Sequence, residues 1–339
     1  MAWSAAIAAS LAIGVGVAMA RSERERRAAP EPEPELDRTF GLLAGERPAE
    51  GLRRVVLGQV DLAIESLEGK ASTGAVHETR KAIKRLSATM RLLEGELGAK
   101  SAGRERRLLR DVARRLAGAR DAEVMVQTLD DLMDRHPRKL GGRRALVELR
   151  GHLERERAAV AARIERDAAT RARALTELRE LRGRVACWRL QDRSAGGLAG
   201  AGLERIYRAG RGGRGRARAR KPPARAWHRW RKHVKDLRYG LEAIDVKDGK
   251  GSAGHVSKLA KRADSLGEAL GQEHDLMLLA GLARAHGPLK RRPRARKRLL
   301  KAIARRRAKL RLKALQESAR LFEHKPKRFV KRVKALSPR

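Results

Sequence analysis

Cysteine, aromatic residues and acidic residues are all scarce in this sequence. The single cysteine, Cys187, excludes an internal disulfide bond and a multi-thiolate metal site, and it fits a reducing compartment such as the cytoplasm. Aromatic residues make up only 3% of the chain, so the core has to be built from Leu, Val, Ala and Ile. Asp and Glu number 40 against 81 Lys and Arg, which gives a net charge of +41. Because so large a charge repels itself within a compact fold, we expect the protein to bind anions.

The abundant residues predict an all-α protein. Ala, Leu, Arg, Glu and Lys dominate the composition and favour helix over strand. Apolar residues recur with helical spacing almost continuously from about Leu52 onward, and no segment alternates apolar and polar residues as a half-buried strand would. Between Leu276 and Gln316 there is no acidic residue, so this part predicts a helix with a strongly cationic surface.

Stretches rich in Gly and Pro predict the division of the chain. Residues 46–208 are expected to form a first helical half and residues 224–335 a second. Between them, residues 209–223 predict a cationic, non-helical linker. Their Arg-Gly composition is equally typical of segments that bind RNA without sequence preference. A shorter helix break is expected at Gly196–Gly202.

The N-terminal segment carries no charge over residues 1–20 and precedes a charged, Pro-rich linker over residues 21–45. A secretory signal would place basic residues before the apolar stretch, and none is present. The stretch is rich in Ala and Gly, which makes its transfer into a bilayer energetically marginal. Three interpretations remain: a membrane anchor, an atypical cleaved signal ending at Ala20, and an over-extended start. The anchor and the over-extended start are favoured.

One pattern, His-x-x-Arg-Lys-x-x-Lys-x-Leu, occurs twice in the chain. Each copy is accompanied by apolar residues at steps of three and four, which predict the buried stripe of a helix. The stripes comprise Val76, Thr79, Ile83, Leu86, Met90 and Leu93 in the first copy and Trp227, Trp230, Val234, Leu237, Leu241 and Ile244 in the second. The basic residues share another face of each helix, and they are His77, Arg80, Lys81 and Lys84, then His228, Arg231, Lys232 and Lys235. Because no acid is interspersed at these positions, the two rows predict a surface for a phosphate polyanion.

A second matched pair follows each His-led helix after just over forty residues. Arg120 and Asp121 occupy this place in the first half, and His274 and Asp275 occupy it in the second. This spacing predicts a second helix that folds back against the first. We expect Asp121 and Asp275 to orient the basic side chains through charge-assisted hydrogen bonds. Local surface salt bridges are an alternative explanation of nearly equal weight.

With these motifs the sequence resembles the CHAD family, the conserved histidine α-helical domain, over roughly residues 46–335. The resemblance implies two antiparallel helical bundles related by pseudo-twofold symmetry, with a basic cleft between them that binds inorganic polyphosphate. It also implies association with polyphosphate granules. By position, one wall would carry His77, Arg80, Lys81, Lys84 and Arg85, and the other His228, Arg231, Lys232, Lys235 and Arg238, with Tyr239 and the two matched pairs as supporting residues.

One position departs from the family pattern. Ser87 stands where the second copy has the basic Arg238, so the first wall is expected to grip phosphate less strongly unless Arg91, one turn further on, substitutes. Some family members carry an adjoining triphosphate-tunnel enzyme domain with alternating Glu-x-Glu-x-Lys residues. The only similar stretch here, residues 31–35, is interrupted by Pro and belongs to the linker.

The residues favour binding over catalysis, with no cofactor or metal. Hydrolysis of phosphate would need clustered carboxylates for a metal ion or a nucleophile beside a base, and neither pattern occurs. Sequence-independent RNA binding is the alternative, because net charge favours it equally. Against it, aromatic platforms for stacking bases are few, and Trp227 and Trp230 belong to a predicted buried stripe.

Overall fold

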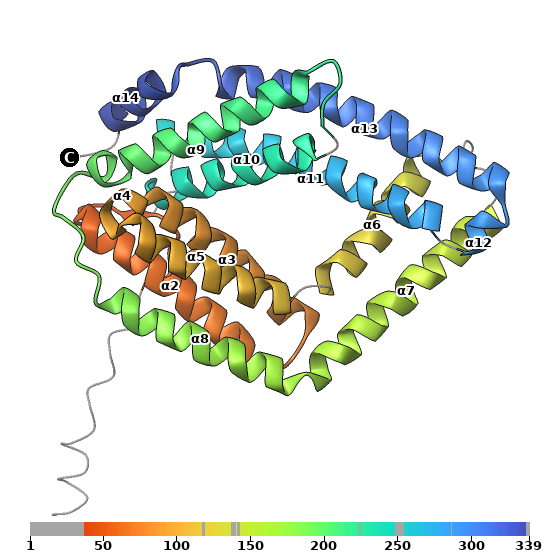
Figure 1. Ribbon diagram of the computed structural model, residues 1–339, viewed down its shortest axis with the longest axis horizontal. Helices are drawn as coiled ribbons and strands as arrows, with labels where there is room; N and C mark the ends of the chain where they lie inside the picture. The colour runs from red at the N-terminus through yellow and green to blue at the C-terminus, as the bar shows by residue number, and fades with distance from the viewer. Residues whose placement is uncertain are drawn as a thin grey trace, which may run out of the picture. The chain divides into compact units, whose positions relative to one another are not determined.

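The computed structural model describes residues 37–116, 119–136, 140, 143–223, 225–247, 254–285 and 287–336. Residues 1–20 and most of the linker over 21–45 lie outside this part. The described chain is almost entirely helical, which confirms the predicted all-α class (Figure 1). No helix of the described residues is both long enough and apolar enough to cross a bilayer.

Helices up to residue 186 build the first part of the fold. They are α2 (Pro48–Glu68), α3 (Thr73–Leu92), α4 (Glu94–Leu97), α5 (Ala99–Arg115), α6 (Ala119–Arg135), α7 (Arg143–Arg166) and α8 (Ala168–Ala186). Local signals set several of these boundaries. Ser72 caps α3 by accepting a hydrogen bond from the backbone N–H of Ala75 at 3.1 Å, and Asp167 caps α8 in the same way.

Helices from residue 195 onward build the second part. They are α9 (Ala195–Arg218), α10 (Ala226–Ala243), α11 (His255–Ala285), α12 (Gly287–Lys290), α13 (Pro293–Leu321) and α14 (Pro326–Leu336). Helix α10 packs against α9, α11 and α3, and α11 packs along α13 (Figure 1). The acid-free segment over residues 276–316 includes the end of α11, all of α12 and most of α13. The apolar side of α13 is buried at Leu299, Ile303 and Leu310.

Two short strands were not predicted. β1 (Leu42–Leu43) and β2 (Val246–Lys247) pair in parallel, so the chain just before α2 is joined to the chain just after α10. The backbone N–H of Leu42 donates to the carbonyl of Asp245 at 3.0 Å. With two residues each, these strands are too short to produce the alternating pattern that reveals a strand in a sequence.

The prediction of a non-helical linker over residues 209–223 was wrong for residues 209–218, which lie in α9. The predicted break at Gly196–Gly202 was also wrong, because these residues belong to the same helix. The glycines of α9 are sites of close packing. A Cβ atom at Gly202 would lie 1.9 Å from the carbonyl oxygen of Leu92, and one at Gly213 would lie 2.7 Å from the Trp230 ring. Glycine at these positions lets neighbouring helices approach α9 closely, and this packing stabilises the helix despite its many glycines.

Three apolar clusters of the described residues form the core, and two of them contain residues from both sides of the predicted boundary at residue 208. One unites α2, α3, α5 and α8. Another gathers around α9, α10, α11 and α14. The third joins α6 and α7 of the first part to α11, α12 and α13 of the second. The two predicted halves thus share a core, and the pseudo-twofold relation between them stays a prediction.

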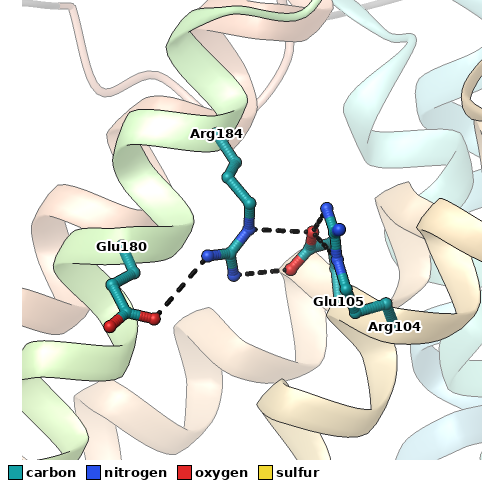
Figure 2. Close-up of polar contacts among 4 residues, drawn as sticks. All are labelled: Arg104, Glu105, Glu180 and Arg184. Carbon is teal, nitrogen blue, oxygen red and sulfur yellow. Dashed lines mark hydrogen bonds and ion pairs between the residues drawn. The ribbon is translucent and has the colours of Figure 1, made fainter.

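Buried carboxylates fix helices to each other in both parts. Glu105 on α5, 2% exposed, accepts hydrogen bonds from Arg184 on α8 at 3.0 and 2.9 Å and from the neighbouring Arg104 (Figure 2). Burial alone would raise the pKa of Glu105, but its hydrogen bonds with the two arginines and their positive charges hold this pKa below its ordinary value. In the second part Glu273 on α11, equally buried, accepts from Arg307 on α13 at 2.8 Å.

Candidate functional site

The duplicated motifs lie on α3 and α10, as the sequence predicts. All twelve residues of the two predicted apolar stripes are buried, and none is more than 6% exposed. The basic residues of each motif lie on the remaining surface of the same helix and are half-buried or exposed. Each helix therefore combines a core face and a cationic face, as an amphipathic pattern of this spacing requires.

The cationic row of α3 is partly engaged by neighbouring groups. Arg80 donates from Nη1 to the backbone carbonyl of Ala113 on α5 at 2.8 Å. The Nζ of Lys81 lies 3.2 Å from a carboxylate oxygen of Glu78, and the Nε2 of His77 lies 4.0 Å from the other oxygen of that residue. Lys84 is half-buried. The α3 row thus contains a nearby acid that the spacing of the basic residues alone does not reveal.

Arg85 and Tyr239 lie against a shared aromatic residue. The guanidinium of Arg85 stacks over the ring of Phe40 at 4.5 Å, and its Nη1 donates to Gln59 of α2 at 3.3 Å. Tyr239 is 8% exposed and meets the same Phe40 ring edge-on, with ring centroids 6.5 Å apart. Burial raises the pKa of Tyr239. Both residues therefore stabilise the junction of α2, α3 and α10.

The cationic row of α10 opens into a cleft of about 410 Å³, whose walls come from α6, α10, α11 and α13. Within the part of the chain that the structure describes, its cationic lining residues are Arg135, Arg231, Lys235, Arg238 and Arg306. Three of these are predicted site residues from α10. None of the five residues predicted on α3 lines this cleft among the described residues. The other lining residues come from α6, α11 and α13 instead.

Carboxylates also line the cleft. Those of the described residues are Asp131, Asp264, Glu268 and Asp275. Arg238 donates from Nε to Glu242 at 2.6 Å and also binds Asp264 through Nη1. Burial alone would lower the pKa of Arg238, but its hydrogen bond with Glu242 and the two negative charges raise it. The predicted phosphate ligand Arg238 is thus held in an ion-pair bridge from α10 to α11.

Two histidines of the second half meet beside the cleft. The Nδ1 atom of His228 on α10 lies 3.3 Å from that of His274 on α11, with ring centroids 4.4 Å apart. Burial lowers the pKa of His228, and the positive charges of Lys232 and Arg231 lower it further. His274, predicted as a supporting residue, thus contacts the predicted ligand His228 directly. Lys232 is exposed.

The matched residues Arg120 and Asp121 lie in α6, but their side chains are outside the described residues. Asp275, their counterpart in the second half, lines the cleft. In the first half, Arg91, the expected substitute for a basic residue at Ser87, forms an ion pair with another helix. Its Nε lies 3.4 Å from a carboxylate oxygen of Asp236, which joins α3 to α10.

Arg135 and Arg306 also line the cleft, and neither was predicted as a site residue. Arg306 belongs to the acid-free segment, which predicted a cationic helix but gave no direction for its side chains. Arg135 follows Gln127 and Asp131 at steps of four along α6, so the three lie on one helix face. That polar row was the available signal. Among the described residues, no cluster of three or more His, Cys, Asp or Glu side chains has the geometry of a metal site.

Comparisons with known proteins identify the class of this helical domain. The model of the CHAD domain matches residues 54–284. The crystal structure of the CHAD domain from the plant Ricinus communis is similar over 86% of this chain and 95% of its own length, with 17% sequence identity and a TM-score of 0.56. PptA from Streptomyces chartreusis is similar over 82% of this chain and 98% of its own, with 18% identity and a TM-score of 0.54.

Because the family match extends over more than half of the chain, the protein belongs to the CHAD family. The two structural similarities agree with this assignment at the level of the fold. A comparison with curated proteins gave no match.

Proposed function

We propose that this protein binds inorganic polyphosphate, without catalysis, through the cationic row of α10 and the cleft into which it opens. The observation that carries the proposal is that Arg231 and Lys235 line the same cleft as Arg135 of α6 and Arg306 of α13. Cations from three helices therefore converge on one hollow. The family membership of the chain supports the choice of polyphosphate among polyanions.

The chemistry of the lining suits a ligand that offers only anionic oxygens. Arginine presents a planar fork of donors that matches phosphate, and lysine adds a mobile point charge. One carboxylate of the cleft, Asp264, positions Arg238 through an ion pair. Affinity arises chiefly from the release of counterions, so it falls steeply as salt increases.

Binding of RNA is supported less well. The segment 209–218, whose composition resembles flexible RNA-binding segments, is helical. Trp227 and Trp230 are 6% and 0% exposed, so neither offers a face on which a base can stack. The Arg-Gly composition therefore no longer argues for RNA, the buried tryptophans argue against it, and only the net charge still favours it.

Equilibrium binding to polyphosphate tests the proposal. The double variant Lys232→Gln/Lys235→Gln removes two charges from the α10 row, and Lys297→Gln/Lys301→Gln removes two exposed charges from α13 as a matched control. The first is expected to reduce the salt dependence of log K by about 1 to 2 units of slope and the second by less. The pair Lys81→Gln/Lys84→Gln measures what the α3 row contributes.

Equal affinity of wild type and the α10 variant would refute the proposed site. Competition separates the two ligand classes: polyphosphate should displace bound RNA, whereas RNA that displaces polyphosphate at equal charge concentration would favour the alternative function. We further propose that binding directs the protein to polyphosphate granules in the cytoplasm. Fluorescence microscopy of the tagged protein in cells with and without granules tests that localisation.

A further inference from the structure

The cleft continues beyond α10 into a second hollow. This hollow has a volume of about 300 Å³ and lies over α11 and α13. Glu268, Gln272 and Arg306 line both hollows, so the two are contiguous at these residues. Arg306 donates to the side-chain oxygen of Gln272 at 3.2 Å, which places the guanidinium at the junction of α11 and α13.

The second hollow adds two cations to the row. Lys309 and Lys313 line it together with Arg306, and both lysines are exposed. Lys309 makes no ion pair within the part of the chain that the structure describes. Lys313 lies 3.6 Å from Glu317, whose carboxylate also accepts a hydrogen bond from Ser265. From Arg306 to Lys313 the helix rises by about 10 Å at 1.5 Å per residue.

The sequence around these cations contains few acidic residues. Residues 276–316 contain no acid, so α13 supplies no acidic i,i+4 partner on the N-terminal side of either lysine. Its first acid, Glu317, lies four residues after Lys313. Glu268 is the one carboxylate among the described residues of the second hollow. The second hollow therefore attracts anions along α13. In the cleft, by contrast, the α10 residue Arg238 is already positioned by carboxylates.

We infer that the second hollow is an extension of the binding site that recognises long polyphosphate chains. The inference rests on the proposed function of the cleft. A short oligophosphate that fills the cleft reaches Arg306 at most. A long chain passes Arg306 and continues over Lys309 and Lys313, which adds contacts that only a long ligand makes. The α13 lysines thereby confer selectivity for chain length.

The test compares tripolyphosphate with long-chain polyphosphate of a narrow size range, each titrated against the full-length protein. The variant Lys309→Gln/Lys313→Gln keeps residues of good helix propensity on the exposed side of α13. It is expected to lower the affinity for the long chain by about three- to tenfold and to leave that for tripolyphosphate unchanged. The control Lys297→Gln/Lys301→Gln removes the same charge from the same helix outside the hollow.

Each other outcome has one meaning. If the variant and the control lose equal affinity for the long chain, or if the variant loses as much for tripolyphosphate, the extension does not exist and the cleft remains the proposed site. If wild type binds neither ligand, the proposed function fails together with the extension. The variant Lys232→Gln/Lys235→Gln should weaken both ligands, which distinguishes the cleft from its extension.

Discussion

His228 and His274 come from two different helices and face each other with their Nδ1 atoms 3.3 Å apart. At this distance one ring donates an N–H and the other accepts it, so the pair shares a proton most easily while at least one ring is neutral. Arg231, one turn after His228, and Asp275, directly after His274, both line the cleft. The histidine pair therefore experiences the charge of whatever anion the cleft holds.

This arrangement predicts that binding of polyphosphate tightens as pH falls. Burial, followed by nearby positive charges, lowers the pKa of His228 in the free protein. A bound polyanion favours the protonated form and raises that pKa again, so binding takes up a proton. Affinity should increase from about pH 8 to about pH 6, which spans the ordinary histidine pKa. Binding titrations across this range, at constant ionic strength, measure the effect.

The double variant His228→Gln/His274→Gln should flatten the pH profile, whereas His152→Gln on α7 should leave it as steep as in wild type. An equally steep profile in the double variant would assign the proton uptake to other groups. In the absence of a polyanion, a fall in pH should have the opposite effect: it should weaken folding. Because the folded-state pKa is lowered, the unfolded chain binds more protons below about pH 6.5, and the free energy of unfolding should decline there.

The buried carboxylate between α5 and α8 predicts a stability effect without a binding effect. Glu105→Gln replaces the buried carboxylate that binds Arg184 and Arg104 with a neutral amide, which should lower the free energy of unfolding by about 2 kcal/mol. Glu180→Gln is the matched control, since Glu180 is 61% exposed and lies 3.7 Å from the same arginine (Figure 2). It should cost less than about 0.5 kcal/mol. Denaturant titration measures both.

The pH dependence of that effect follows from the lowered pKa of Glu105. A carboxylate whose pKa is lower in the folded state stabilises the protein at pH values above the ordinary pKa of the group, which is about 4.5. This contribution is lost as pH falls through the folded-state pKa. Wild type should therefore lose stability more steeply than Glu105→Gln in acid. Parallel curves for the two proteins would show that folding does not change the pKa of Glu105.

Glycines along α9 provide a matched pair of substitutions. A Cβ at Gly213 would lie 2.7 Å from the Trp230 ring, whereas one at Gly215, half a turn further on, would meet no atom within 4 Å. Gly213→Ala should destabilise the protein by about 1 to 3 kcal/mol through overpacking. Gly215→Ala should be neutral or stabilising by up to about 1 kcal/mol, because alanine favours helix. Equal effects in thermal unfolding would argue against close packing of α9 on α10.

Arg238 and Lys235 should separate stability from affinity. Arg238 bridges Glu242 and Asp264, so Arg238→Gln leaves two carboxylates without their cation and should cost about 1 to 2 kcal/mol of stability. Lys235→Gln should weaken polyphosphate binding more than Arg238→Gln does, and should destabilise less. Thermal unfolding and binding titrations of both variants decide this. A greater loss of polyphosphate affinity in Arg238→Gln than in Lys235→Gln would indicate that Arg238 is itself a phosphate ligand.

Amphipathic spacing predicted the helices that carry the motifs, and α9 shows where such prediction stops. The stripes of α3 and α10 follow from steps of three and four, because burial of those residues is a local consequence of helix periodicity. In α9 the intrinsic tendency of glycine to break a helix is overcome by packing against residues distant in sequence, such as Leu92 and Trp230. That contribution has no local signal.

The candidate site was predictable on α10 and less so elsewhere. Its motif predicted Arg231 and Lys235 as phosphate ligands, and both line the cleft. The opposite wall depends on how α6 packs between α11 and the rest of the fold, a tertiary arrangement that duplication of the motif does not encode. The α3 row was predicted from its own copy of the same motif, although Glu78 beside it and the contact of Arg80 with α5 make its surroundings different from those of α10.

The pairing of β1 with β2 has a consequence for the way the chain reaches its fold during synthesis. Leu42 emerges from the ribosome early, yet its partner Val246 is made only after most of the domain. At typical rates of translation the interval is about 10 to 40 s. Throughout that time the segment before α2 lacks its backbone partner. Release of a chain that ends before α10 should therefore leave this segment open to proteolysis, whereas the completed domain protects it.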